Sequence, residues 1–223
     1  MVKSFGIILI AVIFLEGSLY PTLAYPFERG PFKVESWKMH RDKGIAKQQK
    51  DDTCGAAVLA TILQLYGASI TEGEILNETG KQGWISFEDI RQSAIKRGYQ
   101  AVGYGGDLDL LGRLQLPAII FLVPEKGREH FSIVYKIDDE RVYLADPAWG
   151  HTRMGLSRFK KLWQTRSGEY YGRFLMVFPK ADQPILNMWP APSPFYGNVA
   201  AIKDVVLFRK HVKPYQRGGI YLP

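Results

Sequence analysis

The strongest constraint on the fold is a pair of alternating segments on either side of a short acidic turn. Residues 130–137 and 141–146 alternate between apolar and polar side chains, and Asp138-Asp139-Glu140 separates them. Alternation is the period of a β-strand, and a short polar break between two such runs predicts a β-hairpin. A hairpin brings the start of its first strand beside the end of its second. We therefore expect His130 and Asp146 to be neighbours.

Most of the predicted helices precede this hairpin. Residues 53–66 are almost entirely apolar and end at Gly67, which predicts a buried central helix that Asp52 or Thr53 caps. Shorter helices are predicted over residues 71–79, 86–97, 108–114 and 156–163, and further strands over 100–104, 117–123 and 171–178. Helices followed by an antiparallel sheet indicate an α+β fold. Trp84 and Trp149 are expected to pack in its core rather than to line a groove.

The N-terminus has the pattern of a secretory signal peptide. Lys3 precedes an apolar run over residues 5–15, and small residues lead to Ala24. The run is shorter than the roughly 20 residues that span a bilayer. We expect residues 1–24 to be cleaved after Ala24 and the protein to reach the periplasm. An uncleaved inner-membrane anchor is the alternative.

The rest of the chain divides into three predicted parts. Residues 25–47 lack a clear period and are expected to form a lead-in arm, residues 48–180 to form one domain, and residues 181–223 to form a basic tail with several prolines. The tail's charge is interpreted as solvated surface, with contact to an anionic membrane or an acidic protein as the alternative. The hydrophobic content of 46% excludes general disorder. The net charge of +7 comes without any nucleic-acid-binding motif, so no nucleic-acid partner is expected.

Cys54 is the only cysteine and begins the central helix. Structural cysteines of exported proteins come in pairs, so a single one is either a small buried side chain or a reactive thiol. The thiolate is the form that attacks carbonyl groups, and the first turn of a helix favours negative charge. Asp51 and Asp52 oppose that charge. A nucleophilic Cys54 would therefore need a cationic partner, which is usually a histidine.

His130 is the best candidate among the four histidines. His40 and His211 lie in irregular segments and His151 in a predicted loop, whereas His130 begins a strand that the hairpin brings beside Asp146. A carboxylate next to a histidine fixes its tautomer and supports its charged form. A structural histidine at a strand end and a turn-forming Asp146 before Pro147 are the alternatives.

Gln48 lies six residues before Cys54. Acyl transfer needs hydrogen-bond donors for a developing oxyanion, and a glutamine amide together with the backbone N–H of the nucleophile can supply them. An ordinary surface glutamine is the alternative reading of Gln48.

Four motifs together resemble a known family. Gln48, then Cys54-Gly55-Ala56-Ala57, then His130-Phe131, then Asp146-Pro147 are similar in order and spacing to the double-glycine peptidases. These are papain-like cysteine proteases that remove leaders from bacteriocin precursors. The resemblance covers residues 48–178. It implies that Cys54 is the nucleophile, His130 the general base and acid, Asp146 its orienting partner and Gln48 the oxyanion donor, with no cofactor and no metal.

Two departures from the family pattern refine this expectation. Thr53 stands directly before the cysteine, where many members have aspartate. The sequence also lacks a phosphate-binding G-x-x-x-x-G-K-[ST] loop and a second long apolar stretch, unlike members fused to a transporter. The layout resembles the small peptidases encoded with functional-amyloid (Fap-type) secretion systems of Gram-negative bacteria.

The expected function is that of an exported cysteine endopeptidase. The resemblance implies hydrolysis of a peptide bond in a secreted protein or peptide, after a Gly-Gly leader. Expected partners are this substrate and components of a secretion system, with membrane contact only through the signal or anchor and the basic tail. A non-catalytic leader-binding or scaffold module is the alternative.

Overall fold

A computed structural model describes residues 36–124, 128–164, 171–181, 183 and 185–186 of the chain. All described residues belong to one compact unit. The predicted signal peptide, the first part of the predicted arm and the tail from residue 187 onward lie outside the described residues. Among the described residues, no helix is both long and apolar enough to cross a membrane.

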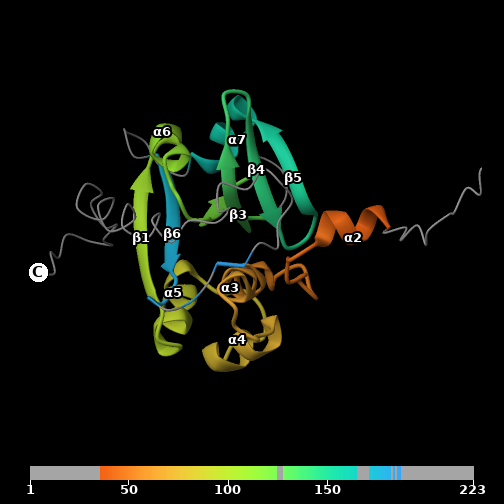
Figure 1. Cartoon of the computed structure of the whole chain (residues 1–223), viewed down its shortest axis with the longest axis vertical. Coiled ribbons are helices and arrows are strands. Elements are labelled where there is room, and N and C mark those ends of the chain that lie inside the picture. The colour runs from red at the N-terminus through yellow and green to blue at the C-terminus, as the bar shows by residue number, and fades with distance from the viewer. Residues whose placement is uncertain (1–35, 125–127, 165–170, 182, 184, 187–223) are drawn as a thin grey trace, which may run out of the picture. The chain divides into compact units, whose positions relative to one another are not determined.

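The described chain forms helices packed on one antiparallel sheet, in which the spatial order of the strands differs from their order in the chain. This arrangement confirms the predicted α+β class (Figure 1). Six strands pair in the order β1-β6-β2-β3-β4-β5. In chain order the elements are α2 (Trp37–Asp42), α3 (Cys54–Leu65), α4 (Glu72–Thr79), α5 (Phe87–Lys96), β1 (Gln100–Gly106), α6 (Leu108–Gly112), β2 (Ala118–Leu122), β3 (His130–Ile137), β4 (Arg141–Asp146), β5 (Gly150–Gly155), α7 (Leu156–Trp163) and β6 (Gly172–Phe178).

The sheet buries an apolar core on each of its faces. On one face, Phe131, Ile133 and Tyr135 of β3 pack in the core that contains α3. On the other face, Val134 of β3 packs in the core that contains the buried aromatic residues of α7. Successive residues of a strand point to opposite faces of the sheet, so β3 contributes side chains to both cores. Every residue of α3 except Gln64 is buried, which confirms the predicted central helix.

Capping residues explain where α4 and α5 begin. Thr71 and Ser86 each accept a hydrogen bond from a backbone N–H of the first turn, and Glu74 and Asp89 return a bond to the cap. These capping boxes satisfy backbone donors that a helix start otherwise leaves unpaired. The α3 helix has Thr53 at its N-cap, but the Thr53 side chain makes no capping bond.

The structure adds two elements that the sequence pattern did not predict. The first is strand β5, which places His151 on a strand rather than in a loop. β5 lies at the edge of the sheet and has no apolar alternation; its pairing with β4 holds it in place. The second is α2, a helix of six residues with none buried, too short to show an amphipathic period. Trp149 is 72% exposed, so its predicted core position is wrong.

Candidate active site

Cys54 is the first residue of α3 and its side chain is fully buried. The backbone N–H of Phe131 on β3 donates a hydrogen bond to its Sγ over 3.5 Å. The neighbouring Gly55 allows this close approach, because a Cβ at this position would lie 2.7 Å from Cγ1 of Ile85 and 3.3 Å from the ring of Phe131. The start of α3 is therefore packed directly against the start of β3, where His130 is the first residue.

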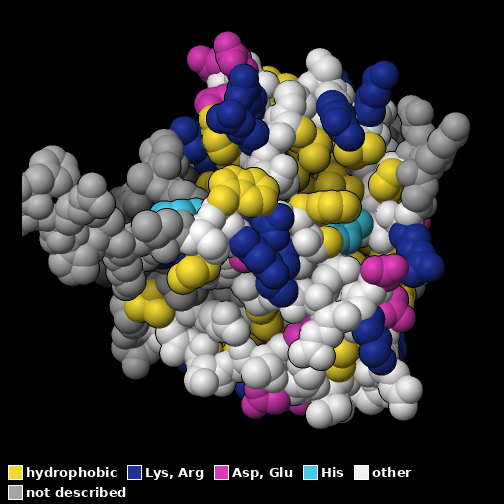
Figure 2. Space-filling view, turned by 90° about the vertical axis from the view of Figure 1, so that its right-hand side faces the viewer, with side chains coloured by type: hydrophobic (Ala, Val, Ile, Leu, Met, Phe, Trp, Pro, Cys, Tyr) yellow, Lys and Arg dark blue, Asp and Glu magenta, His cyan; other side chains and the backbone are white. Residues whose placement is uncertain are grey.

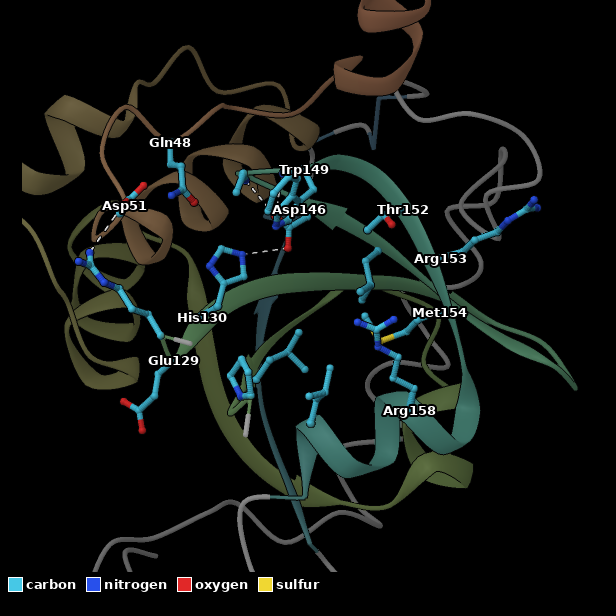
Figure 3. Close-up of a pocket in the computed structure, with 16 residues that line it drawn as sticks. Gln48, Asp51, Glu129, His130, Asp146, Trp149, Thr152, Arg153, Met154 and Arg158 are labelled. Carbon is cyan, nitrogen blue, oxygen red and sulfur yellow. Dashed lines mark hydrogen bonds and ion pairs between the residues drawn. The ribbon is translucent and has the colours of Figure 1, made fainter. Parts of the chain in front are cut away.

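The hairpin brings His130 and Asp146 into direct contact, as the sequence predicted. The Nε2 atom of His130 lies 2.9 Å from Oδ2 of Asp146 (Figure 3). The other carboxylate oxygen of Asp146, Oδ1, accepts hydrogen bonds from the backbone N–H groups of Ala148 at 2.9 Å and Trp149 at 3.0 Å. These bonds fix the carboxylate, and the carboxylate in turn fixes the imidazole ring with Nδ1 left for the sulfur of Cys54.

The contacts of His130 favour its charged form. Burial alone lowers the pKa of this imidazole, but hydrogen bonds to Asp146 and Cys54 outweigh burial and raise the pKa to about 9. For Asp146, burial acts to raise the carboxyl pKa, and the hydrogen bond and charge of His130 outweigh it and lower the pKa. At neutral pH the pair is thus an imidazolium and a carboxylate. An imidazolium beside a sulfur stabilises negative charge on that sulfur.

Three hydrogen bonds within the loop between Gln48 and α3 share one acceptor, the carbonyl oxygen of Lys50. The carbonyl oxygen of Lys50 accepts from Nε2 of Gln48 at 3.0 Å, from the hydroxyl of Thr53 at 2.9 Å and from the backbone N–H of Thr53 at 3.3 Å. The Thr53 hydroxyl therefore fastens the loop instead of capping α3. This contact gives Thr53 a role at the position where many double-glycine peptidases have aspartate, and it sets Gln48 near the start of the helix.

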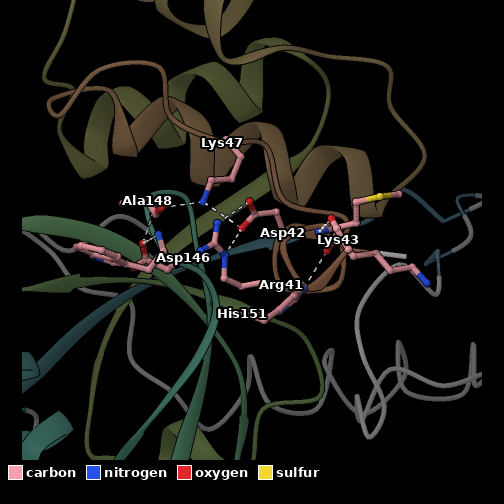
Figure 4. Close-up of polar contacts among 10 residues, drawn as sticks. Arg41, Asp42, Lys43, Lys47, Asp146, Ala148 and His151 are labelled. Atoms are coloured by element: carbon pink, nitrogen blue, oxygen red, sulfur yellow. Dashed lines mark hydrogen bonds and ion pairs between the residues drawn. The ribbon is translucent and has the colours of Figure 1, made fainter. Parts of the chain in front are cut away.

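Residues before Gln48 are fastened to the loop after Asp146 (Figure 4). Nζ of Lys47 donates to the carbonyl of Ala148 at 2.8 Å, the N–H of Gln48 donates to the carbonyl of Pro147 at 3.2 Å, and Nε2 of His151 lies 2.9 Å from the carbonyl of Lys43. Residues 43–48 thus hold the Gln48 loop against the strand end that carries Asp146.

Gly150 is required for this attachment. Its φ of +81° is a conformation that side chains rarely adopt, and a Cβ would meet the carbonyl oxygen of Arg41 at 2.6 Å. The sequence showed only a glycine after Trp149; the approach of α2 that makes it necessary is a tertiary contact.

A cavity of about 430 Å³ opens beside the His130–Asp146 pair. Gln48, His130 and Asp146 all line it, whereas Cys54 is not among its lining residues. The structure thus brings three of the four predicted site residues to one cavity, and the fourth, Cys54, lies at the buried start of α3. The sequence did not single out Arg158, which also lines the cavity, and it assigned Trp149, another lining residue, to the core. Among the described residues, no group of three or more His, Cys, Asp or Glu side chains could hold a metal ion.

A helix that begins at a cysteine, packed on an antiparallel sheet that carries a hydrogen-bonded histidine and aspartate, defines the papain-like cysteine peptidase class. The sequence model of the Peptidase C39 family matches residues 42–167, more than half of the chain. The chain belongs to this family, which confirms the predicted resemblance.

Known relatives agree with this membership. The chain is 34% identical over 140 residues to "Probable functional amyloid protease FapD" of Pseudomonas aeruginosa, across 59% of this chain and 62% of that protein. It is 31% identical over 159 residues to the lactococcin-G-processing and transport ATP-binding protein LagD of Lactococcus lactis, across 69% of this chain and 22% of that protein. The matches thus span less than two thirds of either relative.

Solved structures support the fold. The peptidase domain of Streptococcus ComA, a bi-functional ABC transporter, matches with a TM-score of 0.53 and 23% identity, over 63% of this chain and all of that one. A double-glycine-motif protease from an AMS/PCAT transporter, solved with its leader peptide, matches with a TM-score of 0.52 and 21% identity, over 63% of this chain and 94% of that one.

Proposed function

We propose that the protein is an exported cysteine endopeptidase that cleaves a secreted protein or peptide after a Gly-Gly leader. The observation that carries the proposal is the 2.9 Å contact between His130 and Asp146 at the strand end that packs against Cys54. In this proposal Cys54 is the nucleophile, His130 the general acid and base, Asp146 its orienting partner and Gln48 an oxyanion donor.

Acylation begins with the Cys54 thiolate and the His130 imidazolium. Sγ attacks the carbonyl carbon of the scissile bond, and a C–S bond forms as the carbonyl electron pair moves to oxygen. The imidazolium then gives the proton on its Nδ1 to the leaving amine, the C–N bond breaks, and a thioester remains. Asp146 stays ionised and holds the ring through Nε2.

The proposal assigns two hydrogen-bond donors to the oxyanion. One N–H of the Gln48 side chain donates to Lys50, and the other has no acceptor among the described residues. The backbone N–H of Cys54 is one of the free donors at the helix start, since the first turn of a helix leaves its N–H groups unpaired. In acyl-transfer enzymes, removing one oxyanion donor lowers kcat by about 10²–10³-fold.

Deacylation reverses the roles of the imidazole. Neutral His130 takes a proton from water on Nδ1, and the water oxygen attacks the thioester carbon. The C–S bond then breaks, the carboxylic acid product leaves, and the thiolate–imidazolium pair is restored. Every proton and electron pair in both steps is carried by the substrate, water, Cys54 or His130.

The Gly-Gly leader and export rest on likeness and on the N-terminal sequence. Three similar proteins support a leader substrate. One is named for lactococcin-G processing, one is named a probable functional amyloid protease, and one is a double-glycine-motif protease solved with its leader peptide. The apolar run over residues 5–15 supports export. Protein recovered from the periplasmic fraction should begin at Tyr25; a start at Met1 would instead support the uncleaved anchor.

The test of the activity uses purified protein and a peptide library in which randomised residues flank a Gly-Gly pair. Mass spectrometry of the products should show cleavage after Gly-Gly by the wild type and none by Cys54→Ala or His130→Ala, with circular dichroism confirming that both variants fold. Equal product from all three proteins would exclude the proposed mechanism. Cleavage that depends on Cys54 but occurs at other sequences would retain the peptidase and reject the Gly-Gly specificity.

The alternative is a leader-binding or scaffold module with an idle site. It predicts that wild type and Cys54→Ala bind the same peptides with equal affinity and that neither cleaves them. It also predicts that iodoacetamide near neutral pH leaves Cys54 unmodified in the folded protein. The protonated His130 beside the sulfur favours the peptidase over this alternative.

A further inference from the structure

The cavity beside His130 extends beyond the residues that are proposed to take part in catalysis. Its wall away from α3 comes from β4, β5 and α7 and combines apolar side chains with arginine. The apolar lining there includes Leu144, Met154 and Leu162, and Arg158 reaches from α7 toward Met154 (Figure 3). The volume of about 430 Å³ lies within the range of about 300–1000 Å³ that is typical of ligand sites. This part of the cavity has the size and chemistry to bind a side chain.

The charges in the cavity leave Arg158 available. Asp51 pairs with Arg128 at 3.7 Å, and the Asp146 carboxylate is held by His130 and two backbone N–H groups. Glu129 points away from Arg158 (Figure 3). Within the described part of the chain, Arg158 makes no ion pair. Arg158 is thus an exposed residue that lines the cavity and has no carboxylate partner among the described residues.

The position of Arg158 in its helix is electrostatically unfavourable. Arg158 lies in the first turn of α7, and this turn contains no acidic residue. The positive end of the helix dipole disfavours a cation there by about 0.3–1 kcal/mol. Lys160 and Lys161, by contrast, lie in the last turn of the same helix, where the dipole favours them. Helix stability thus explains the two lysines but not Arg158.

We propose that this part of the cavity binds an acidic side chain of the substrate peptide, with Arg158 pairing its carboxylate and Leu144, Met154 and Leu162 contacting its apolar stem or an apolar neighbour. Guanidinium and carboxylate groups match in a two-bond geometry. Gln48 and His130 line the same cavity, so the acidic residue lies within a few residues of the scissile bond. Arg158 is then a specificity determinant, and this assignment rests on the proposed peptidase function. Figure 2 shows basic side chains beside hydrophobic ones on one face of the molecule.

The test separates binding from cleavage. Fluorescein-labelled Gly-Gly peptides carry a single glutamate, or a single glutamine in its place, at each position from four before to four after the glycine pair. Binding to Cys54→Ala protein is measured by anisotropy, and kcat/KM is measured with the active protein. At one position the glutamate peptide should bind about fivefold more tightly, which corresponds to about 1 kcal/mol. Arg158→Gln should remove this difference, and Arg158→Glu should reverse it for a lysine peptide.

Lys161→Gln is the matched control, because it removes the same charge from α7 at a residue that does not line the cavity. It should leave the fivefold preference unchanged. A preference that survives Arg158→Gln, an equal loss in Lys161→Gln, or no binding of any peptide would overturn the proposal. A preference in Cys54→Ala protein without any cleavage by the active protein would reject the proposed peptidase and keep the acidic-residue site.

Discussion

The backbone N–H of Phe131 donates a hydrogen bond to Sγ of Cys54, across 77 positions of the sequence. Because β3 begins at His130 and α3 begins at Cys54, this contact sets the imidazole beside the sulfur. The thiol is buried and held by backbone, so its position depends on how closely the helix packs on the strand. Changes to that packing should affect the site and the stability together.

Gly55→Ala should destabilise the protein by about 1–2 kcal/mol. Its new Cβ would overlap Ile85 and press on Phe131, and such overpacking destabilises a protein by about 1–3 kcal/mol. The better helix propensity of alanine offsets up to about 1 kcal/mol of this loss. Urea unfolding of the wild type and the variant measures the change in the free energy of unfolding.

Gly73→Ala in α4 is the control for this substitution, since nothing lies within 4 Å of its Cβ position. It should stabilise the protein by about 0.5–1 kcal/mol. If the two glycine variants are equally stable, the close packing of α3 on β3 is wrong.

Replacing Asp146 with asparagine should lower kcat/KM by about 10⁴-fold, because the imidazole loses the partner that fixes its tautomer and supports its charge. The loss of its hydrogen bond and charge should also bring the pKa of His130 down from about 9 toward 6.5. Steady-state kinetics on a Gly-Gly peptide and NMR titration of the imidazole measure the two effects in Asp146→Asn.

Asp146→Ala should be less stable than Asp146→Asn. Asparagine keeps an oxygen for the N–H groups of Ala148 and Trp149, whereas alanine leaves both donors without their acceptor, at about 1–3 kcal/mol. An unchanged His130 pKa in both variants would contradict the assigned role of Asp146.

Stability should fall at alkaline pH because of His130. Its folded-state pKa of about 9 lies above the unfolded value of 6.5, so its contribution is fully present below pH 6.5 and is lost as pH rises through about 9. At about 1.4 kcal/mol per pKa unit this amounts to about 3–4 kcal/mol. Urea unfolding of the wild type and His130→Gln at pH 6 and pH 10 measures it. The wild type should lose more stability than the variant, and parallel losses would refute the raised pKa.

Gln48→Ala should reduce kcat by about 10²–10³-fold with little change in KM, as expected for an oxyanion donor. Gln49→Ala provides the matched control, because Gln49 is exposed and its recorded contacts to Glu72 come from its backbone N–H. Kinetics on the same Gly-Gly peptide should show near wild-type rates for the control. Equal effects of the two substitutions would remove Gln48 from the catalytic machinery.

Local pattern was sufficient for most elements of this fold. Alternation over residues 130–146 predicted the hairpin. It also predicted the contact between His130 and Asp146, because a short turn pairs the two strands and so brings the start of the first beside the end of the second. The helices predicted over residues 71–79 and 86–97 begin where the structure shows the capping boxes of Thr71 and Ser86, whose hydrogen bonds are equally local. Edge strand β5 and helix α2 escaped prediction, since neither buries a periodic apolar face. β5 is held by its pairing with the preceding strand β4, and the α2 segment by contacts with residues about 100 positions later in the chain.

The sequence by itself determined the residue types of the site, their order and the α+β class, because periodicity, turns and caps act over a few residues. Only the tertiary structure decided how Cys54 meets His130, which depends on the packing of α3 against β3. It also decided that Lys47 and Gln48 are fastened to the loop after Asp146, and that Arg158 lines the cavity beside His130 without a carboxylate partner in the described chain. These relationships join residues far apart in sequence, and their energies depend on burial and distance, which no local pattern contains.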